Sequence, residues 1–323
     1  MSSPKKLLLM GRSGSGKSSM RSIIFSNYSA YETQRLSATM DVEHSHLRFL
    51  GNMTLNLWDC GGQDVFVENY FSSQRDHIFG GVEVHIHVFD VQSNEVQKDI
   101  RTFIECLSHL RKFSPKARIF VLIHKMDLVK PEKRPEIFDT FMLYLRDQSK
   151  PYGFEITGFM TSIWDESLYK AWSQIVCSMV PNMSMFQRYL QRFAEISEAE
   201  EVVLFERTTF LVISHVSPLA ERQASYEKLL EQTGDGEPLR KLDPKRFEKI
   251  SNIIKTYKQS CSKLQAQLQT LTLHGPSCSA YIDTLTNNTF VMVVMPPGES
   301  ETQGNTIVAN IKGAKEWFEK VEQ

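Results

Sequence analysis

A glycine-rich stretch near the N-terminus limits what this chain can fold into more than any other feature. Residues 11–18 read Gly-Arg-Ser-Gly-Ser-Gly-Lys-Ser and follow an apolar run at 6–10. This spacing, between an expected strand and an expected helix at 17–25, is typical of a phosphate-binding loop. Glycines let backbone N–H groups approach phosphate oxygens, and the following helix presents its positive end to an anion. The pattern therefore predicts a nucleotide-binding α/β domain.

The loop residues divide into side-chain ligands and backbone ligands. The Lys17 ammonium can span the β- and γ-phosphates, and the Ser18 hydroxyl can bind Mg²⁺. The other nucleotide-binding candidates in this segment are Arg12, Ser13, Gly14, Ser15, Gly16 and Ser19. An incidental Gly/Ser-rich turn is the alternative, and the strand–loop–helix context disfavours it.

A second motif indicates a triphosphate that can be hydrolysed. An apolar run at 55–58 predicts a strand that ends at Asp59, and Cys-Gly-Gly-Gln follows. Asp59 is expected to bind Mg²⁺ through a water molecule, and the Gly62 N–H can detect the γ-phosphate. Gln63 can orient the attacking water and is the catalytic candidate.

Between these motifs lies a candidate switch segment. Thr39 can give Mg²⁺ a second hydroxyl only when a γ-phosphate is present, so its ordering and release would form a switch. Ser37 is a nearby alternative for the same ligand. Thr33 could fold over the nucleotide or be an ordinary solvated hydroxyl.

The residues expected to read the base depart from the usual pattern. Small GTPases carry Asn-Lys-x-Asp after an apolar strand, whereas this chain has His124, Lys125 and Asp127 after 119–123. Asp127 can accept hydrogen bonds from both donor groups on the guanine edge, and the stem of Lys125 can cover the base. A neutral His124 supplies only one donor and one acceptor. The motif alone therefore leaves guanine selectivity open.

Two residues after the last expected strand of this domain complete the predicted site. Ser162 and Ile163 follow an expected strand at 154–161 and are placed to close over the base. An ordinary strand-to-helix turn is the alternative.

Two His-x-His pairs have a spacing that metal ligands can use. They are His44 with His46 and His85 with His87. Because no further Cys or His cluster is apparent, histidines on strand surfaces are the better interpretation.

Breaks in the pattern divide the chain into two expected domains, 1–181 and 182–323. The first alternates strands at 6–10, 44–50, 53–58, 82–90, 117–123 and 154–161 with helices at 17–25, 94–112, 132–146 and 166–179. Alternation predicts a mostly parallel sheet with helices on both faces, and Gly51-Asn52 predicts a hairpin that adds one antiparallel edge strand. Pro181 ends this alternation of strands and helices.

The second expected domain has another order of elements. Helices are expected at 183–199, 244–268 and 306–321, and strands at 201–205, 209–214, 270–274, 279–285 and 289–295. This order predicts a compact α+β domain. The polar stretch 215–242 is expected to be a mobile loop.

Charge, cysteine content and hydropathy limit the expected partners, the compartment and the contact with membranes. The formal net charge of −1 argues against nucleic acid or anionic lipid as an obligatory partner. Five scattered cysteines without a CxxC pair indicate free thiols in a reducing compartment. Since no apolar run reaches membrane-spanning length and no lipidation motif is present, direct membrane insertion is not expected.

The motifs together resemble the Rag/Gtr family of GTPases, on the side of the A/B-type Rag subunits and the first fungal Gtr subunit. The matching runs lie at 9–25, 41–46, 56–64, 124–129, 161–166, 204–213 and 246–255. The resemblance therefore extends over both expected domains. Histidine in place of asparagine at position 124 is itself a feature of this family.

The resemblance implies a function for the whole chain. It implies a GTP/GDP switch with Mg²⁺ that forms a heterodimer with a C/D-type Rag subunit through a roadblock-like C-terminal domain. It further implies a lipid-anchored scaffold complex and a GTPase-activating protein as partners. The heterodimer would report amino-acid sufficiency to the target-of-rapamycin kinase complex. Its expected location is the cytoplasmic face of the vacuole or lysosome, with cytoplasm and nucleus as further compartments.

Two other classes of function remain alternatives. A P-loop ATPase or nucleotide kinase would need a phosphate-acceptor site or an arginine lid, and neither is apparent in the sequence. A structural subunit with a fixed nucleotide is disfavoured by Gln63 and Thr39.

Overall fold

The chain folds into two compact units. Unit 1 comprises residues 1–48 and 53–179, and unit 2 comprises 49–52 and 180–323. The computed structural model describes residues 4–26, 28–50, 53–218, 246–276, 278–297 and 301–322. The predicted hairpin turn Gly51-Asn52 lies outside the described residues.

Unit 1 contains a six-stranded sheet in the order β2-β3-β1-β4-β5-β6. The strands are β1 (Lys5–Gly11), β2 (Val42–Arg48), β3 (Thr54–Cys60), β4 (Val82–Asp90), β5 (Arg118–His124) and β6 (Ile156–Thr161). The edge strand β2 is antiparallel to β3, and the other neighbours are parallel. The predicted α/β P-loop GTPase-type sheet is therefore confirmed.

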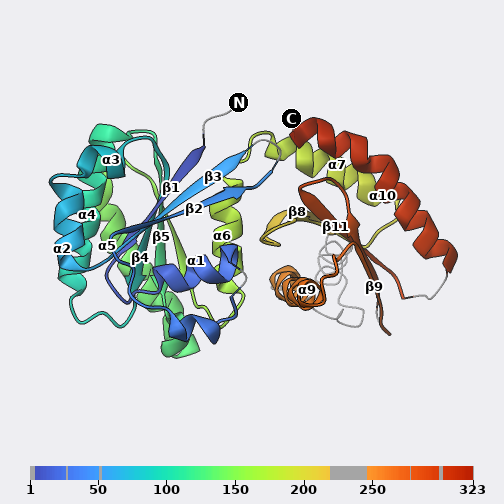
Figure 1. The fold of residues 1–323 in the computed structure, drawn as a ribbon, viewed down its shortest axis with the longest axis horizontal. Helices are drawn as coiled ribbons and strands as arrows, with labels where there is room; N and C mark the ends of the chain where they lie inside the picture. The colour runs from blue at the N-terminus through green and yellow to red at the C-terminus, as the bar shows by residue number, and fades with distance from the viewer. Residues whose placement is uncertain are drawn as a thin grey trace, which may run out of the picture. The chain divides into compact units, whose positions relative to one another are not determined.

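Helices cover both faces of this sheet (Figure 1). One face carries α1 (Lys17–Phe25) and α6 (Ser167–Cys177), and the other carries α2 (Asp64–Phe71), α3 (Arg75–Phe79), α4 (Val96–Phe113) and α5 (Arg134–Ser149). Short 3₁₀ turns are η1 (Glu32–Arg35), η2 (Met126–Leu128), η3 (Pro131–Lys133) and η4 (Lys150–Tyr152). In α4, buried apolar residues recur every three or four positions and pack on the sheet: Ile100, Phe103, Leu107 and Leu110.

The central strands place the two histidine pairs in different environments. His44 and His46 lie exposed on the edge strand β2, as predicted. The prediction of surface histidines is wrong for His85 and His87, which are 0% and 1% exposed. The reason is that β4 lies between β1 and β5, so helices bury side chains on both of its faces.

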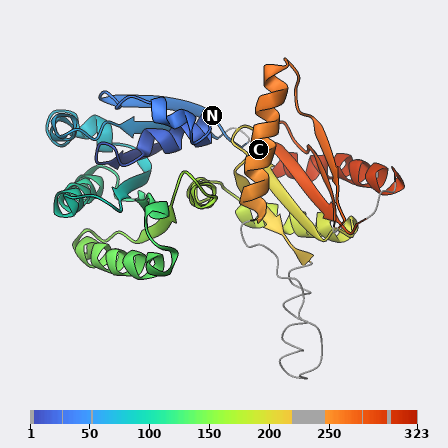
Figure 2. The same ribbon diagram turned by 90° about the horizontal axis from the view of Figure 1, so that it is seen from below.

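Unit 2 contains an antiparallel five-stranded sheet in the order β8-β7-β11-β10-β9. Its elements are α7 (Met183–Ile196), β7 (Glu201–Glu206), β8 (Val212–Val216), α9 (Arg246–Lys263), β9 (Thr270–His274), β10 (Ser279–Thr284), β11 (Thr289–Met295) and α10 (Glu301–Glu322). The helices α7 and α10 lie side by side on one face, and α9 covers the other (Figures 1 and 2). This is the α+β arrangement expected of a roadblock-like domain.

The region after β7 differs from the prediction at two points. Strand β8 starts at Val212 because Glu206 accepts hydrogen bonds from the N–H groups of Thr208 and Thr209, which forms a turn. His215 and Val216 belong to β8 and not to the predicted loop. Residues 219–242 of that loop lie outside the described residues.

A helix that crosses a membrane must be both long and apolar. Across the described part of the chain, no helix combines the length and the apolar character needed to cross a bilayer.

Candidate nucleotide-binding site

The phosphate loop adopts a backbone path that requires glycine. Gly11, Gly14 and Gly16 have φ angles of 142°, 77° and 97°, in the region that favours glycine. A Cβ on Gly11 would lie 2.3 Å from the Val88 carbonyl oxygen, so no side chain fits between β1 and β4. Helix α1 begins directly after this loop, at Lys17. Its first N–H groups therefore point toward the space where an anion would bind.

Lys17 is held inside the loop. Its Nζ donates hydrogen bonds to the carbonyl oxygens of Gly11 (2.8 Å) and Arg12 (2.9 Å). Burial lowers the pKa of Lys17 to about 8, and the nearby Asp59 carboxylate partly opposes this shift. A bound phosphate would add negative charge beside the ammonium and so favour its charged form.

Three residues meet where Mg²⁺ was predicted. The hydroxyls of Ser18 and Thr39 are 2.5 Å apart, and Thr39 is buried. Asp59 is fully buried, with its Oδ2 3.2 Å from the Nε of Arg21. Adjacent ligands of an octahedral Mg²⁺ lie about 2.9 Å apart, so the hydroxyl pair needs to open by only a few tenths of an ångström. The residues present therefore fit this ion.

The environment of Asp59 also suits a nearby cation. Burial raises the pKa of its carboxyl, while Ser18, Lys17 and Arg21 lower it. A divalent cation would add a stronger opposing charge than any of these neighbours. Sequence reasoning did not identify Arg21, because nothing in its spacing indicated that it reaches β3.

A cavity of about 260 Å³ gathers most of the predicted phosphate site. The predicted residues that line it are Ser13, Gly14, Gly16, Lys17, Ser18, Ser19, Thr33, Thr39, Gly62 and Gln63. Leu36, Ser37 and Ala38 complete the lining. Of the two candidates for the second hydroxyl, Thr39 makes the contact with Ser18, whereas Ser37 is exposed. The Thr33 hydroxyl donates to the Ala30 carbonyl at 2.7 Å, within its own turn.

The segment after Asp59 lies against the phosphate loop. The Ser13 N–H donates to the Gly62 carbonyl at 3.0 Å, and a Cβ on Gly62 would lie 2.3 Å from the Ser13 nitrogen. Gln63 is the residue before α2, and its Oε1 is buried without a hydrogen bond to any described residue. The Asp41 carbonyl accepts hydrogen bonds from the Gly61 N–H (2.6 Å) and the Tyr70 hydroxyl (2.8 Å). This carbonyl therefore links the segment that carries Thr39 to the segment that follows Asp59.

His124 lies beneath the phosphate loop. Its side chain is 2% exposed, and its Nδ1 is 3.0 Å from the Thr161 hydroxyl. A Cβ on Gly16 would lie 2.7 Å from the imidazole Cδ2, so the ring packs directly against the loop. Burial lowers the pKa of His124 to about 4, and the Lys125 ammonium contributes to the shift. A neutral imidazole therefore joins the ends of β5 and β6 to the loop.

The base end is held by side chains on neighbouring strand ends. Ser162 is buried, and its hydroxyl donates to Asp127 Oδ1 at 2.7 Å. Lys125 has a left-handed φ of 63°, and its Nζ forms a 2.6 Å ion pair with Asp90. One Asp127 oxygen is thus fixed, and the half-exposed carboxylate can still accept bonds from a base. Sequence reasoning missed Asp90, which follows no motif spacing.

The next two residues of the base-end loop lie at the surface. Ile163 is half exposed beside Ser162. Trp164 makes an edge-on ring contact with Tyr31 at 5.1 Å between centroids. This contact, which joins the loop to the segment before Thr33, was also not predicted from the sequence.

Two predicted residues are turned away from the phosphate cavity. The Arg12 guanidinium pairs with Glu95 at 2.7 Å and donates to the Ser93 hydroxyl at 3.0 Å. The Ser15 hydroxyl is buried without a hydrogen bond within the described residues. Both residues can contact a phosphate only through their backbone N–H groups.

Comparison with known proteins agrees with this geometry. The family model described as "Gtr1/RagA G protein conserved region" matches residues 6–254. "GTP-binding protein GTR1" of Saccharomyces cerevisiae is 58% identical over 316 residues, or 98% of each chain. "Ras-related GTP-binding protein A" of Dictyostelium discoideum is 49% identical over 98% of this chain and 97% of its own length. "Ras-related GTP-binding protein C" of Homo sapiens is 28% identical over 70% of this chain and 56% of its own length. The chain belongs to the Gtr1/RagA family of GTP-binding proteins.

Proposed function

We propose that this chain is a Rag-type regulatory GTPase, which binds GTP with Mg²⁺ and hydrolyses it slowly to GDP and phosphate. The 2.5 Å contact between the Ser18 and Thr39 hydroxyls carries the proposal. It brings the phosphate loop and the switch segment to one point, where a cation can hold both only while a γ-phosphate is bound. Gln63 lines the same cavity.

Each residue has a defined part in the proposed reaction. Lys17 and the loop N–H groups bind the β- and γ-phosphates, and Ser18, Thr39 and Asp59 would hold Mg²⁺, which neutralises charge on the phosphates. Gln63 orients the attacking water. The nearest loop arginine, Arg12, is engaged by Glu95 and Ser93. Hydrolysis is therefore expected to be slow until an activating protein supplies positive charge.

The proposed switch depends on the link between the segment that carries Thr39 and the segment that follows Asp59. Loss of the γ-phosphate releases Thr39 and, two residues on, the Asp41 carbonyl. Since Gly61 and Tyr70 both donate to that carbonyl, its movement changes the segment that carries Gln63 and the start of α2. A partner that binds this surface would then distinguish GDP from GTP.

Single-turnover hydrolysis tests the catalytic part of this proposal. With an activating protein present, Gln63→Leu is expected to lower the rate at least about 100-fold, because the water loses its orienting group. The exposed Gln92 provides a matched control, and Gln92→Leu should leave the rate unchanged. An unchanged rate in Gln63→Leu would remove this residue from the mechanism. Preference for ATP in a binding competition would contradict the assignment of a GTPase.

The chain would form a heterodimer with a C/D-type Rag subunit through unit 2. The similarity to "Ras-related GTP-binding protein C" and to "GTP-binding protein GTR2" of Saccharomyces cerevisiae supports a partner of this type. Helix α9 exposes Ile253 and Tyr257 one turn apart, at 57% and 53%. Apolar residues exposed on one face of a helix suit a protein interface.

The heterodimer would act at the vacuolar or lysosomal surface. There a lipid-anchored scaffold complex would hold it, and it would signal amino-acid sufficiency to the target-of-rapamycin kinase complex.

Co-purification with the C/D-type subunit tests the formation of the heterodimer. Ile253→Asp is expected to abolish co-purification, whereas Leu143→Asp, at a more exposed position on α5 in unit 1, should not. Equal binding of the kinase complex to the GDP and GTP states would favour a structural subunit with a fixed nucleotide.

A further inference from the structure

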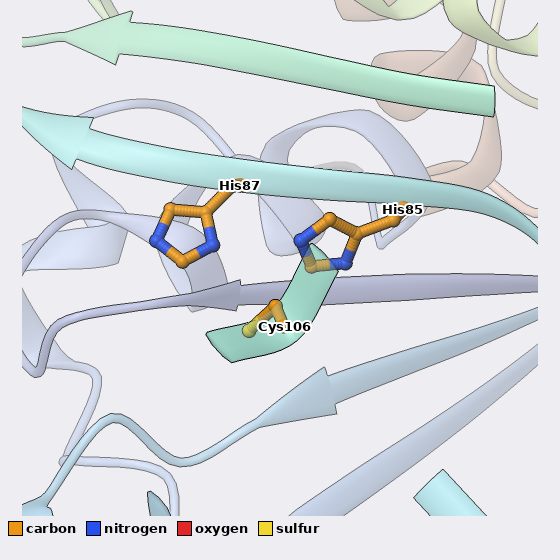
Figure 3. Close-up of side chains that lie close together, drawn as sticks. All are labelled: His85, His87 and Cys106. Carbon is orange, nitrogen blue, oxygen red and sulfur yellow. The ribbon is translucent and has the colours of Figure 1, made fainter. Parts of the chain in front are cut away.

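A buried group of three potential metal ligands lies outside the nucleotide site. His85 and His87 project from the same face of β4 toward Cys106 on α4 (Figure 3). One ligand atom from each of the three lies within 4.8 Å of the other two, and all three side chains are buried. Ligand atoms around a metal bound by His and Cys are about 3.5 Å apart. The side chains therefore need to close by roughly 1 Å.

The imidazoles lack the hydrogen bonds that buried polar groups normally make. Both ring nitrogens of His85 and the Nδ1 of His87 have no hydrogen-bond partner among the residues the structure describes. The neighbours of His87 include the apolar rings of Phe89 and Phe103, at centroid distances of 4.8 and 5.0 Å. Unpartnered buried polar atoms in a native protein call for an explanation, and a bound ion is one.

The protonation state of the imidazoles suits metal binding. Burial lowers the pKa of His85 to about 3 and that of His87 well below its usual value. Both rings are therefore neutral at physiological pH and offer lone pairs. The Cys106 thiol is protonated without a metal, because burial raises its pKa.

The net charge of the metal complex favours Cu⁺ over Zn²⁺ at this cluster. Two neutral imidazoles and one thiolate give a neutral complex with Cu⁺ and a positive one with Zn²⁺. A net charge buried without a partner is costly, and the nearby Lys17 ammonium makes a further positive charge less favourable. In addition, Met10 Sδ lies 3.7 Å from Cys106 Sγ and offers a thioether, a soft ligand that suits Cu⁺.

A small cavity borders the cluster at His87 and Met10. It has a volume of about 40 Å³, and its lining includes Met10, His87, Cys60 and Thr102. Three carboxylates also line it, and each is already engaged. Asp99 accepts a hydrogen bond from Ser93 at 2.5 Å, Glu95 pairs with Arg12, and Asp64 pairs with Lys98. The cavity also borders Gly61 and Gly62, so it reaches the segment expected to move during the switch.

We propose that His85, His87 and Cys106 form a binding site for one Cu⁺ ion, with Met10 as a fourth, weaker ligand. Binding replaces the S–H bond of Cys106 with a Cu–S bond. One proton passes to the solvent for each ion bound, and no electron is transferred.

Metal competition on the full-length, GDP-loaded chain tests the proposal. The chain is incubated under nitrogen with equimolar Cu⁺ and Zn²⁺, washed with a chromophoric Cu⁺ chelator, and analysed for both elements. We expect about one equivalent of Cu⁺ and less than about a tenth of an equivalent of Zn²⁺. Cys106→Ala and His85→Leu should each lose the Cu⁺. The matched control is Cys177→Ala, which removes a half-buried cysteine of α6 outside the cluster and should retain the Cu⁺.

Thermal unfolding gives a second measurement that does not depend on metal analysis. Cu⁺ should raise the Tm of the unmodified chain and of Cys177→Ala by about 5–10 °C, with no rise in His85→Leu. His85→Leu is expected to fold, because leucine removes two unpartnered nitrogens from an apolar site. Retention of Cu⁺ by His85→Leu, uptake of Zn²⁺ in place of Cu⁺, or no uptake by the unmodified chain would each overturn the proposal.

Discussion

The two ends of the nucleotide site are built in different ways. At the phosphate end, each contact involves a loop: Ser18, at the start of α1, meets Thr39, and the backbone of Ser13 meets that of Gly62. At the base end, contacts join side chains at the ends of neighbouring strands, as when Lys125 pairs with Asp90. Loops can exchange such contacts at low cost, whereas the ends of paired strands are fixed by the whole sheet.

We expect the base end to set the affinity for guanine nucleotides and the phosphate end to distinguish GTP from GDP. At the base end Asp127 is oriented before a ligand arrives, because Ser162 holds one of its oxygens. Little conformational entropy is then lost on binding, which favours tight binding of GDP and GTP alike. In the proposed switch, the phosphate end would differ between the two nucleotides, because only GTP would hold Thr39 through a cation. Substitutions at the two ends should therefore have effects of different kinds.

The largest effect is expected from Asp127→Ala. Loss of a charged acceptor for two base donors should weaken guanine-nucleotide binding about 1,000-fold. The factor should be the same for GDP and GTP, since the base end does not sense the γ-phosphate. Equilibrium titration with each nucleotide measures it. Ser162→Ala, which only frees the Asp127 oxygen, should cost about tenfold. Unequal factors for GDP and GTP would contradict the separation of the two ends.

The substitution His124→Asn tests whether the imidazole beneath the phosphate loop is neutral. The measured quantity is the pH dependence of the free energy of unfolding. The pKa of His124 is lowered from 6.5 to about 4, so the unfolded chain binds a proton there that the native chain does not. This contribution to stability is complete above pH 6.5 and is lost as the pH falls toward 4. Between pH 7 and pH 5, the unmodified chain should lose about 2 kcal/mol more than His124→Asn.

Urea unfolding at both pH values measures that difference. His46→Asn is the control, because this histidine is exposed on the edge strand β2. Its pH dependence should resemble that of the unmodified chain. Identical pH dependence in His124→Asn and the unmodified chain would show that the imidazole under the loop is not kept neutral.

Gly62→Ala should change the phosphate end alone. The new Cβ would lie 2.3–2.5 Å from backbone atoms of Gly11, Arg12 and Ser13, so the two segments must separate. The preference of a switch-dependent partner for the GTP state should fall about 10- to 100-fold, while GDP affinity changes less than about threefold. Partner binding in both nucleotide states measures this. Gly81→Ala is the control for a glycine with open space around it, although its positive φ adds some strain. Weakened GDP binding in Gly62→Ala would mean that the segment supports both states.

The contrast between the two ends of the site also explains which of its residues could be predicted from the sequence. The phosphate loop depends on local spacing, so its strand, its glycines and the start of α1 at Lys17 were found from the sequence. The helix at Asp64–Phe71 was missed because it is short and its apolar residues also suited a loop. The partners of Lys125 and Asp59 come from other elements, and no spacing identifies them.

The histidines show where local sequence fails most clearly. His44 and His85 occur in the same His-x-His pattern, but one lies on an edge strand and the other on a central strand. Strand order decides which is buried, and strand order is a property of the whole sheet. The position of His124 under Gly16 likewise follows from the way β1 and β5 are brought together.

The smallest effect is expected from Ser13→Gly, at the point where the phosphate end meets Gln63. The Ser13 side chain is exposed and lines the cavity that Gln63 also lines, so it limits the space for the attacking water and its orienting group. Removing it should raise intrinsic, activator-free hydrolysis roughly three- to tenfold, a change of about 1 kcal/mol in the barrier. The Ser13 N–H that binds Gly62 is retained in this variant, so nucleotide affinity should not change. Ser19→Gly, in the same cavity but on α1, is the control and should not accelerate hydrolysis. An unchanged single-turnover rate in Ser13→Gly would place the slow step elsewhere, in the missing positive charge that the engaged Arg12 does not supply.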